Sequence, residues 1–439
     1  MCRLLTAGLI VLVAGAASAA PLPCTVLDNG LSVLAMRSEH LSTASMAIVL
    51  PISAADETGR LEGARAVLQQ TLALDSHRSV SESGVPGSGL IRSTTAGLDV
   101  NTNWDFVEAS YTVALDELDE ALAMMAEQIF VHELTPESFE QGRELVQRGY
   151  DASHDSPVQT TFDLFRLALY GDAPMGRPVQ GDPEALEQMS LEALQAFRAD
   201  HYVPGGAWLC VVSPLPADEA VAAVNRAMGG LPAASPPAEP QVSTPPEESL
   251  VEVGESFDLV QASMVVGVPL PSYGDPLFPA GEVIAALLDG PEGRLQRDLS
   301  LLQTLGLSLP TRVLEEHYPI GTLPVPAARD PYLAIHALAA PRSIERVRVG
   351  LLRHLLALQT GSVTEAELER ARQRMINAHR LSTARPAEAA LYLARRALFG
   401  LGDGDEAVAA IESVTPEQIN AVAARYFNRH AIGVQMPAT

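Results

Sequence analysis

Three residues in the segment Gly63–Leu72 are spaced as the catalytic residues of a metal-dependent hydrolase would be. Apolar residues recur in this segment at the i, i+3, i+4 spacing of an amphipathic helix. Ala66, Gln69 and Gln70 fall on one side of the predicted helix, at the spacing of the pattern H-x-x-E-H. In that pattern two histidines bind zinc and the glutamate acts as the base. An alanine and two neutral amides can neither hold zinc strongly nor accept a proton near neutral pH.

The histidines offer no second candidate of this kind. No two of the 10 histidines are four residues apart, so no helix can present the paired imidazoles of the H-x-x-E-H pattern. His317 follows Glu315 and Glu316, and a solvated loop is the simpler interpretation of this cluster. Asp75 and His77 are similarly isolated. We therefore expect no metal site in this chain.

Composition excludes several other kinds of chemistry. The 439 residues include no lysine, and 54 acidic against 29 basic residues give a formal net charge of −25. Schiff-base catalysis needs a lysine, and the chain has no G-x-S-x-G elbow, lysine-containing phosphate loop or dinucleotide fingerprint. So acidic a surface repels nucleic acid and anionic lipid.

The start of the chain predicts an export signal. Arg3 gives a basic beginning, an apolar run continues through Val13, and Ala17-Ser18-Ala19 matches a small-residue cleavage site before Ala20. An uncleaved membrane anchor is the alternative, but the run is shorter than the roughly 20 apolar residues that a span requires. We expect residues 1–19 to be removed and the protein to be periplasmic or secreted, in a Gram-negative envelope.

Two cysteines, Cys24 and Cys210, remain after removal of the signal. An exported location permits a disulfide between them. Cys210 lies in the apolar run Ala207–Val212, where a buried free thiol is equally consistent. Pro23 precedes Cys24 where a lipoprotein signal requires a small residue, which disfavours a lipid anchor.

Strands and helices alternate around the Gly63–Leu72 helix. Turn residues, period-two alternation and helix-start signatures such as Thr135-Pro136-Glu137 locate these elements, and the Ser-, Gly- and Pro-rich segment Leu74–Thr95 predicts a loop. Strands are predicted on both sides of the Asn29-Gly30 turn and at Ser45–Leu50, Gly97–Val113 and Ala207–Ser213, and helices at Asp116–Phe130, Thr135–Tyr150 and Asp182–His201.

The second half of the chain repeats the first. The helix start at Thr135 is echoed at Thr364, and the one at Ser190 is echoed at Thr415, at nearly equal separations. Met228–Ser249 is rich in proline and acid, as an extended linker is. These features predict an α+β fold of two homologous mixed α/β domains. The predicted segments are a signal peptide at 1–19, an N-terminal domain at 20–227, the linker at 228–249 and a C-terminal domain at 250–439.

This order of motifs resembles the insulinase/pitrilysin family of zinc peptidases, in the short-chain branch that includes mitochondrial processing peptidase and its bacterial relatives. The resemblance implies two metallopeptidase-like halves that face one another and usually pair with a second such chain around a peptide-binding chamber. It rests on Leu27-Asp28-Asn29-Gly30-Leu31, Gly63, Asn101, Gly176-Arg177-Pro178-Val179-Gln180-Gly181, the helix starts, the strand at Leu209 and the linker.

The resemblance breaks at the zinc site. Alignment on Gly63 and Leu68 places the family's two zinc histidines at Ala66 and Gln70 and its base at Gln69. The family's third ligand is a glutamate, expected just before Asp155-Ser156-Pro157. The chain has Gln147-Arg148-Gly149-Tyr150 there, without a carboxylate.

The second half of active relatives supplies an arginine and a tyrosine that hold substrate. The tyrosine position falls at Leu309 here, and the arginine position at Ser300 or Leu302. Arg294 and Arg297 lie nearby and, with Asn101 on the Gly97 strand, are candidate substrate-binding residues. Ordinary arginines on a helix face are the alternative interpretation.

The resemblance and the missing ligands together indicate a non-catalytic family member. We expect it to be the partner of an active periplasmic zinc peptidase in a heterodimer, with zinc only in that partner and peptides as ligands. An edge strand near Gly97–Asn101 could pair with an extended peptide. The alternatives are a stand-alone envelope protein that binds peptides or acts as a scaffold, and a metallopeptidase with a non-standard site. We expect neither nucleic-acid binding nor a stable membrane span.

Overall fold

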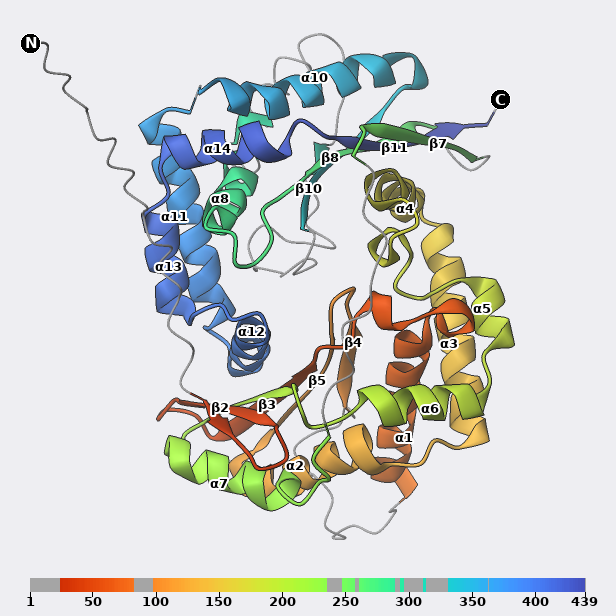
Figure 1. Ribbon diagram of the computed structural model, residues 1–439, viewed down its shortest axis with the longest axis vertical. Coiled ribbons are helices and arrows are strands. Elements are labelled where there is room, and N and C mark those ends of the chain that lie inside the picture. The colour runs from red at the N-terminus through yellow and green to blue at the C-terminus, as the bar shows by residue number, and fades with distance from the viewer. Residues whose placement is uncertain are drawn as a thin grey trace, which may run out of the picture.

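Two mixed β-sheets form the framework of the protein (Figure 1). The computed structural model describes residues 24–82, 98–234, 247–256, 260–288, 293–295, 311–312, 331–361 and 363–438. Sheet A has the strand order β1-β2-β6-β3-β5-β4, and sheet B has the order β7-β11-β8-β10-β9. Sheet A contains β1 (Thr25–Val26), β2 (Ser32–Arg37), β3 (Thr43–Leu50), β4 (Asp99–Thr102), β5 (Val107–Ala114) and β6 (Trp208–Ser213). Sheet B contains β7 (Leu250–Ser256), β8 (Ala262–Pro269), β9 (Thr311–Arg312), β10 (Tyr332–Ala339) and β11 (Ala431–Pro437).

Helices surround both sheets, which confirms the predicted α+β class. The first half carries α1 (Ala64–Glu82), α2 (Leu118–Ala126), α3 (Pro136–His154), α4 (Pro157–Tyr170), α5 (Pro183–Gln188), α6 (Leu191–His201) and α7 (Ala217–Met228). The second half carries α8 (Phe278–Leu288), α10 (Ile344–Ala357), α11 (Glu365–Ser382), α12 (Pro386–Leu398), α13 (Gly404–Glu412) and α14 (Pro416–Tyr426). No helix in these described ranges is long and apolar enough to cross a membrane.

The repeat seen in the sequence recurs in the structure. Thr135 and Thr364 cap α3 and α11, and each side chain accepts a hydrogen bond from the backbone N–H three residues later. Ser190 and Thr415 cap α6 and α14 in the same way. In each sheet one parallel pair, β2 with β6 and β7 with β11, adjoins antiparallel strands. The two halves therefore follow one plan.

Each sheet packs one face against helices of its own half. Met46, Ile48 and Leu209 of sheet A contribute to a core with α1, α2 and α7. Met264 and Ile432 of sheet B contribute to a second core with α8, α10, α11 and α14. These alternating apolar positions on adjacent strands provide the face that the helices cover.

The opposite face of each sheet is covered by a helix from the other half of the chain. Figure 1 shows α4 against sheet B and α12 against sheet A. Phe165 of α4 is fully buried beside Val265 and Tyr332, with its ring 5.2 Å from that of Tyr332. Leu393 of α12 packs with Val49 of β3 and other apolar residues of sheet A. This reciprocal exchange holds the two halves together.

Several sequence predictions need correction or remain outside the described structure. The loop predicted from Leu74 begins too early, because α1 continues to Glu82. The predicted signal and most of the linker lie outside the described residues. Cys24 is exposed, Cys210 is buried, and both are free thiols in the structure. Burial in an apolar strand raises the pKa of Cys210 to about 12.

Candidate functional site

Close backbone contacts position the start of α1. Gly63 has a φ of 92°, and a Cβ on it would lie 2.3 Å from the carbonyl oxygen of Gln180. Gly181 has a φ of 87°, and its Cβ would lie 2.4 Å from the carbonyl oxygen of Glu62. Both positions therefore require glycine. Arg177 Nη1 also lies 2.7 Å from Glu62 Oε1. Two motifs far apart in the sequence thus meet at the beginning of this helix.

A buried ion pair fixes the first turn of α1. Arg65 is fully buried, and its Nε lies 3.2 Å from Glu57 Oε1. Burial raises the pKa of Glu57, although the charge and hydrogen bonds of Arg65 oppose that rise. The guanidinium also donates to the carbonyl oxygens of Ile52, Asn103 and Trp104. Because Asn103 and Trp104 follow β4, these bonds hold α1 beside that strand.

Ala66, Gln69 and Gln70 lie on the side of α1 between Arg65 and Thr71. Arg65 points toward the end of β4, whereas Thr71 lies against α3. The exposed fractions are 9% for Ala66 and 1% for Gln69, and Gln70 is partly buried. The side chains present are a methyl group and two amides. This donor set does not fit zinc, which binds to imidazole, thiolate or carboxylate groups.

Replacing Gln69 with methionine is expected to stabilise the fold by about 1 kcal/mol. Both amide atoms of Gln69 are buried and have no hydrogen-bond partner within the part of the chain that the structure describes. An apolar side chain of similar size removes this desolvation cost. Urea unfolding measures the effect, with Gln70→Met at the partly buried neighbouring position as the control. A loss of stability in Gln69→Met would contradict the expectation.

Helix α3 lies against α1 and carries the segment where a third ligand was expected. A Cβ on Gly142 would lie 2.4 Å from Thr71 Oγ1, so the two helices are in close contact there. Further along α3, Gln147 donates to Asp151 on the exposed side at 3.1 Å, and Gly149 has no side chain. The Gln147–Tyr150 segment thus provides no carboxylate toward α1.

Metal-ligating side chains meet only in pairs within the described ranges, where no group of three or more histidine, cysteine, aspartate or glutamate residues could hold a metal ion. His132 Nε2 lies 3.1 Å from Asp75 Oδ2, and His379 Nε2 lies 3.9 Å from Glu282 Oε2. His317 lies outside the described residues, as does the side chain of His77.

Strand β4 carries Asn101 and ends the strand order of sheet A. The Asn101 Nδ2 group donates to Glu108 Oε1 at 2.8 Å across the β4–β5 pair. Glu108 is 3% exposed and also accepts from Arg395 Nε at 2.6 Å. The candidate residue Asn101 is therefore connected, through Glu108, to helix α12 of the second half.

Arg294 forms an ion pair with Glu367, at the start of α11. Its Nε and Nη2 atoms lie 3.3 and 3.1 Å from the two carboxylate oxygens. Burial alone would raise the pKa of Glu367, but hydrogen bonds from Arg294 and Thr364 lower the pKa to about 2. Arg294 and Asn101 lie in different halves, and the structure does not bring them together. Arg297 and Leu309 lie outside the described residues.

Stability is expected to fall between pH 4.5 and pH 2 as this pair is lost. The Glu367 pKa is depressed from 4.5 to about 2, so the pair contributes fully above pH 4.5 and loses its contribution as Glu367 is protonated. The expected loss is about 2 kcal/mol. Thermal unfolding at pH 5, 4 and 3 measures it. In Arg294→Ala that pH-dependent loss should shrink, and an unchanged profile would rule out the pair as its source.

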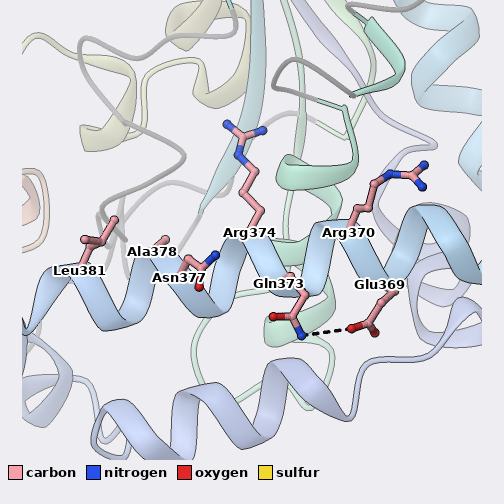
Figure 2. A pocket seen from close by; sticks show the side chains of 7 residues that line it. All are labelled: Glu369, Arg370, Gln373, Arg374, Asn377, Ala378 and Leu381. Atoms are coloured by element: carbon pink, nitrogen blue, oxygen red, sulfur yellow. Dashed lines mark hydrogen bonds between the residues drawn. The ribbon is translucent and has the colours of Figure 1, made fainter.

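An open hollow of about 520 Å³ lies along α11 (Figure 2). Arg370 and Arg374 extend from one side of the helix, while Gln373 donates to Glu369 at 3.1 Å on another. The described lining contains no nucleophile and no paired carboxylates, so it has no catalytic constellation. The lining residues are Glu369, Arg370, Gln373, Arg374, Asn377, Ala378 and Leu381.

Comparison with known families matches residues 188–375 to the peptidase M16 inactive domain. This match supports the resemblance to the insulinase/pitrilysin family. The matched region begins after α1 and α3, so it does not include Ala66, Gln69 or Gln70. The word "inactive" in that family's description therefore says nothing about these three positions of the M16-like chain.

Curated relatives of this M16-like protein include an uncharacterized zinc protease of Mycobacterium leprae, 26% identical over 214 residues, or 47% of this chain and 45% of that protein. A similarly named protein of Mycobacterium bovis is 24% identical over 57% of each chain. The chain thus aligns with about half the length of these relatives.

Solved structures share the whole fold at low identity. A protease from Helicobacter pylori superposes with a TM-score of 0.78 at 15% identity, covering 94% of this chain and 99% of that one. A peptidase M16 inactive domain from Pseudomonas fluorescens gives 0.77 at 16%, covering 95% and 98%. A chain of Complex III2 from Candida albicans gives 0.74 at 15%, covering 94% and 95%. The two-sheet M16 architecture is therefore shared.

Proposed function

We propose that this M16-like protein is a non-catalytic partner subunit of an active periplasmic zinc peptidase. In this role it completes a peptide-binding chamber and stabilises its partner, and zinc is bound only by that partner. The single observation that carries the proposal is the state of α1. The helix is held in place by glycine contacts and a buried ion pair, while Ala66, Gln69 and Gln70 cannot perform zinc-dependent hydrolysis.

The chain keeps the contacts that position α1 but lacks the zinc ligands, and this combination favours a structural role over a catalytic one. The glycine contacts before α1 and the Arg65–Glu57 pair preserve the geometry of the helix. An M16-like chain is also found in a structure described as Complex III2, so chains of this fold occur within assemblies. Fold similarity alone does not establish function, and the local chemistry at α1 therefore carries more weight.

Peptide contact is proposed at β4. This strand ends the order of sheet A, and backbone groups on an outer strand edge can pair with an extended peptide. Asn101 Nδ2 donates a hydrogen bond to Glu108, so the Asn101 side chain would present its amide oxygen to a peptide. In this proposal the M16-like chain binds peptide and does not cleave it.

Co-purification from the native host tests the proposed role. A tagged chain is expected to bring down a family member with an intact H-x-x-E-H motif, and the reconstituted pair should hydrolyse peptides faster than that member alone. Asp119→Asn, at an exposed ion pair on α2, serves as a surface control that should leave pairing unchanged. Absence of such a partner, together with direct peptide binding, would favour a stand-alone peptide-binding or scaffold protein. Stoichiometric zinc and hydrolysis by the chain alone would favour a non-standard metallopeptidase.

A further inference from the structure

A series of buried hydrogen bonds joins helix α4 of the first half to sheet B of the second (Figure 1). Thr161 Oγ1 lies 2.8 Å from Ser263 Oγ, and Ser263 Oγ lies 2.9 Å from His336 Nε2. The Thr161 hydroxyl also lies 2.6 Å from the carbonyl oxygen of Pro157. The exposed fractions are 0% for Thr161 and Ser263 and 5% for His336. The imidazole therefore lies inside the contact between the two halves.

The surroundings of His336 favour its neutral form. The ring of Phe162 lies 6.3 Å from the imidazole, and Val265 of β8 and Arg312 of β9 pair with His336 in the sheet. Tyr332, four residues earlier on β10, is a phenol that carries no charge at neutral or acidic pH. No carboxylate in the described part of the chain offsets the cost of a buried imidazolium, so burial lowers the pKa of His336 to about 4.

The charged residues of α4 do not offset this cost either. Asp163 and Arg166 are the charged residues of the helix, and they form an ion pair with each other. The guanidinium of Arg166 lies 4.8 Å over the ring of Trp104, which belongs to the first half. Arg429 of the second half donates at 2.8 Å to a carbonyl oxygen in the last turn of α4, which adds positive charge to the contact. A proton on His336 is therefore unfavourable while α4 covers sheet B.

The crossing of α12 over sheet A is built differently. An ion pair between Arg395 and Glu108 joins these two elements. The buried histidines in the described ranges are His336 and His379. His379 lies on α11 and bonds to Tyr392 of α12 at 2.6 Å, so both partners belong to the second half. Separation of α12 from sheet A would leave this bond within its own half.

We propose that the contact between α4 and sheet B is an acid-sensitive junction that opens at mildly acidic pH while α12 keeps the two halves joined. Opening exposes His336 to water, where the imidazole binds the proton that the closed contact excludes. The pKa of His336 is lowered from 6.5 in the closed contact, so its stabilising effect is complete above pH 6.5 and is lost as the pH falls toward 4. This inference does not depend on the proposed role as a partner subunit.

Two buried thiols can report the two crossings separately. Cys210 is 0% exposed in the apolar cluster that α12 forms with sheet A. Val265→Cys places a thiol in the cluster that α4 forms with sheet B, at a position that is also 0% exposed. Each thiol is studied alone in the full chain, with the other cysteines replaced by alanine. The rate of reaction with dithiodipyridine, divided by the rate for the urea-unfolded protein at the same pH, gives the opening equilibrium of each crossing.

We expect the opening equilibrium at Val265→Cys to rise roughly 50-fold between pH 7.5 and pH 4.5. The value at Cys210 should rise several-fold at most. His336→Gln retains a hydrogen-bonding group for Ser263 but cannot become charged, so it should remove the acid response at Val265→Cys. His40→Gln, at an exposed histidine of the first half, should retain that response.

Three results would overturn the proposal. An equal rise at both thiols would show general acid unfolding, and no rise at Val265→Cys would show that the junction does not respond to acid. An unchanged acid response in His336→Gln, with circular dichroism showing a folded variant, would assign the response to another group. The comparison of the two thiols uses the native His336, so it decides the proposal even if His336→Gln does not fold.

Discussion

Replacing Gly433 with valine is expected to destabilise the protein by about 3 kcal/mol or more. Gly433 lies on β11 where α4 crosses the sheet. A Cβ there would lie 2.4 Å from the backbone nitrogen of Phe165 and 2.4 Å from the carbonyl oxygen of Thr161. Backbone atoms inside a helix cannot move aside as a flexible side chain can. The valine must therefore push α4 away from sheet B and expose the aromatic cluster around Phe165.

Urea unfolding followed by circular dichroism measures this loss. Gly149→Ala is the matched control, because Gly149 lies in α3 and its Cβ would meet nothing within 4 Å. That control should be neutral or slightly stabilising, since alanine favours helix over glycine. If Gly433→Val does not fold, Gly433→Ala provides a smaller, measurable loss. A stability equal to wild type in Gly433→Val would contradict the close contact between α4 and sheet B.

Replacing Arg395 with alanine is expected to cost about 3 to 5 kcal/mol. Arg395 lies on α12 and contacts Glu108 of β5 through both Nε and Nη2, so the pair joins the two halves. Glu108 is 3% exposed, and its removal from water is compensated by Arg395 and by the Asn101 amide. Without Arg395 a charged carboxylate remains buried with one amide donor. That uncompensated charge, more than the lost attraction, accounts for the expected cost.

A double-mutant cycle separates these contributions. Glu108→Gln combined with Arg395→Ala should be less destabilised than the sum of the single variants, because neither charge of the pair remains. Arg385→Ala is the control, since the side chain of Arg385 is 79% exposed in its pair with Glu388 and should contribute less than about 1 kcal/mol. Additivity of Glu108→Gln and Arg395→Ala would show that the two side chains do not interact.

Local signals in the sequence were sufficient for much of the framework. Thr135 and Thr364 mark helix starts because their hydroxyl groups cap the backbone N–H groups of the first turn, an interaction within four residues. The Asn29-Gly30 turn and the strand at Ser45–Leu50 likewise depend on neighbours in sequence. The repeat of these signals indicated two halves of one plan, and the α+β class followed.

The exchange of α4 and α12 could not be predicted from such signals. Both helices bury apolar residues, as a helix in either half would, and only tertiary contacts decide which sheet receives them. The pairing of Thr161 with Ser263, 102 residues apart, illustrates the range involved. Helix α1 continues past Leu74 to Glu82 although the Ser- and Gly-rich composition from Leu74 onward predicts a loop.

The sequence predicts the helix that carries Ala66, Gln69 and Gln70, but not the contacts that hold this helix in place. Spacing alone placed Ala66, Gln69 and Gln70 on a helix. The contacts of Gly63 with Gln180 and of Gly181 with Glu62 join segments that are far apart in the sequence, so local patterns do not predict them. The two glycines in otherwise polar loops do indicate positions with an unusual backbone conformation. The buried role of Arg65 is not among the sequence predictions. A charged residue within an apolar helical segment, with Glu57 shortly before it, is the pattern that could have indicated the buried pair.

Zinc content of the purified chain tests the central claim most directly. The full chain, residues 1–19 included, is expressed, purified without chelators, and analysed by inductively coupled plasma mass spectrometry alongside a peptide hydrolysis assay. Since Ala66, Gln69 and Gln70 offer no strong ligand, we expect zinc far below one equivalent and no hydrolysis by the chain alone. One equivalent of zinc that co-elutes with peptidase activity would contradict the account.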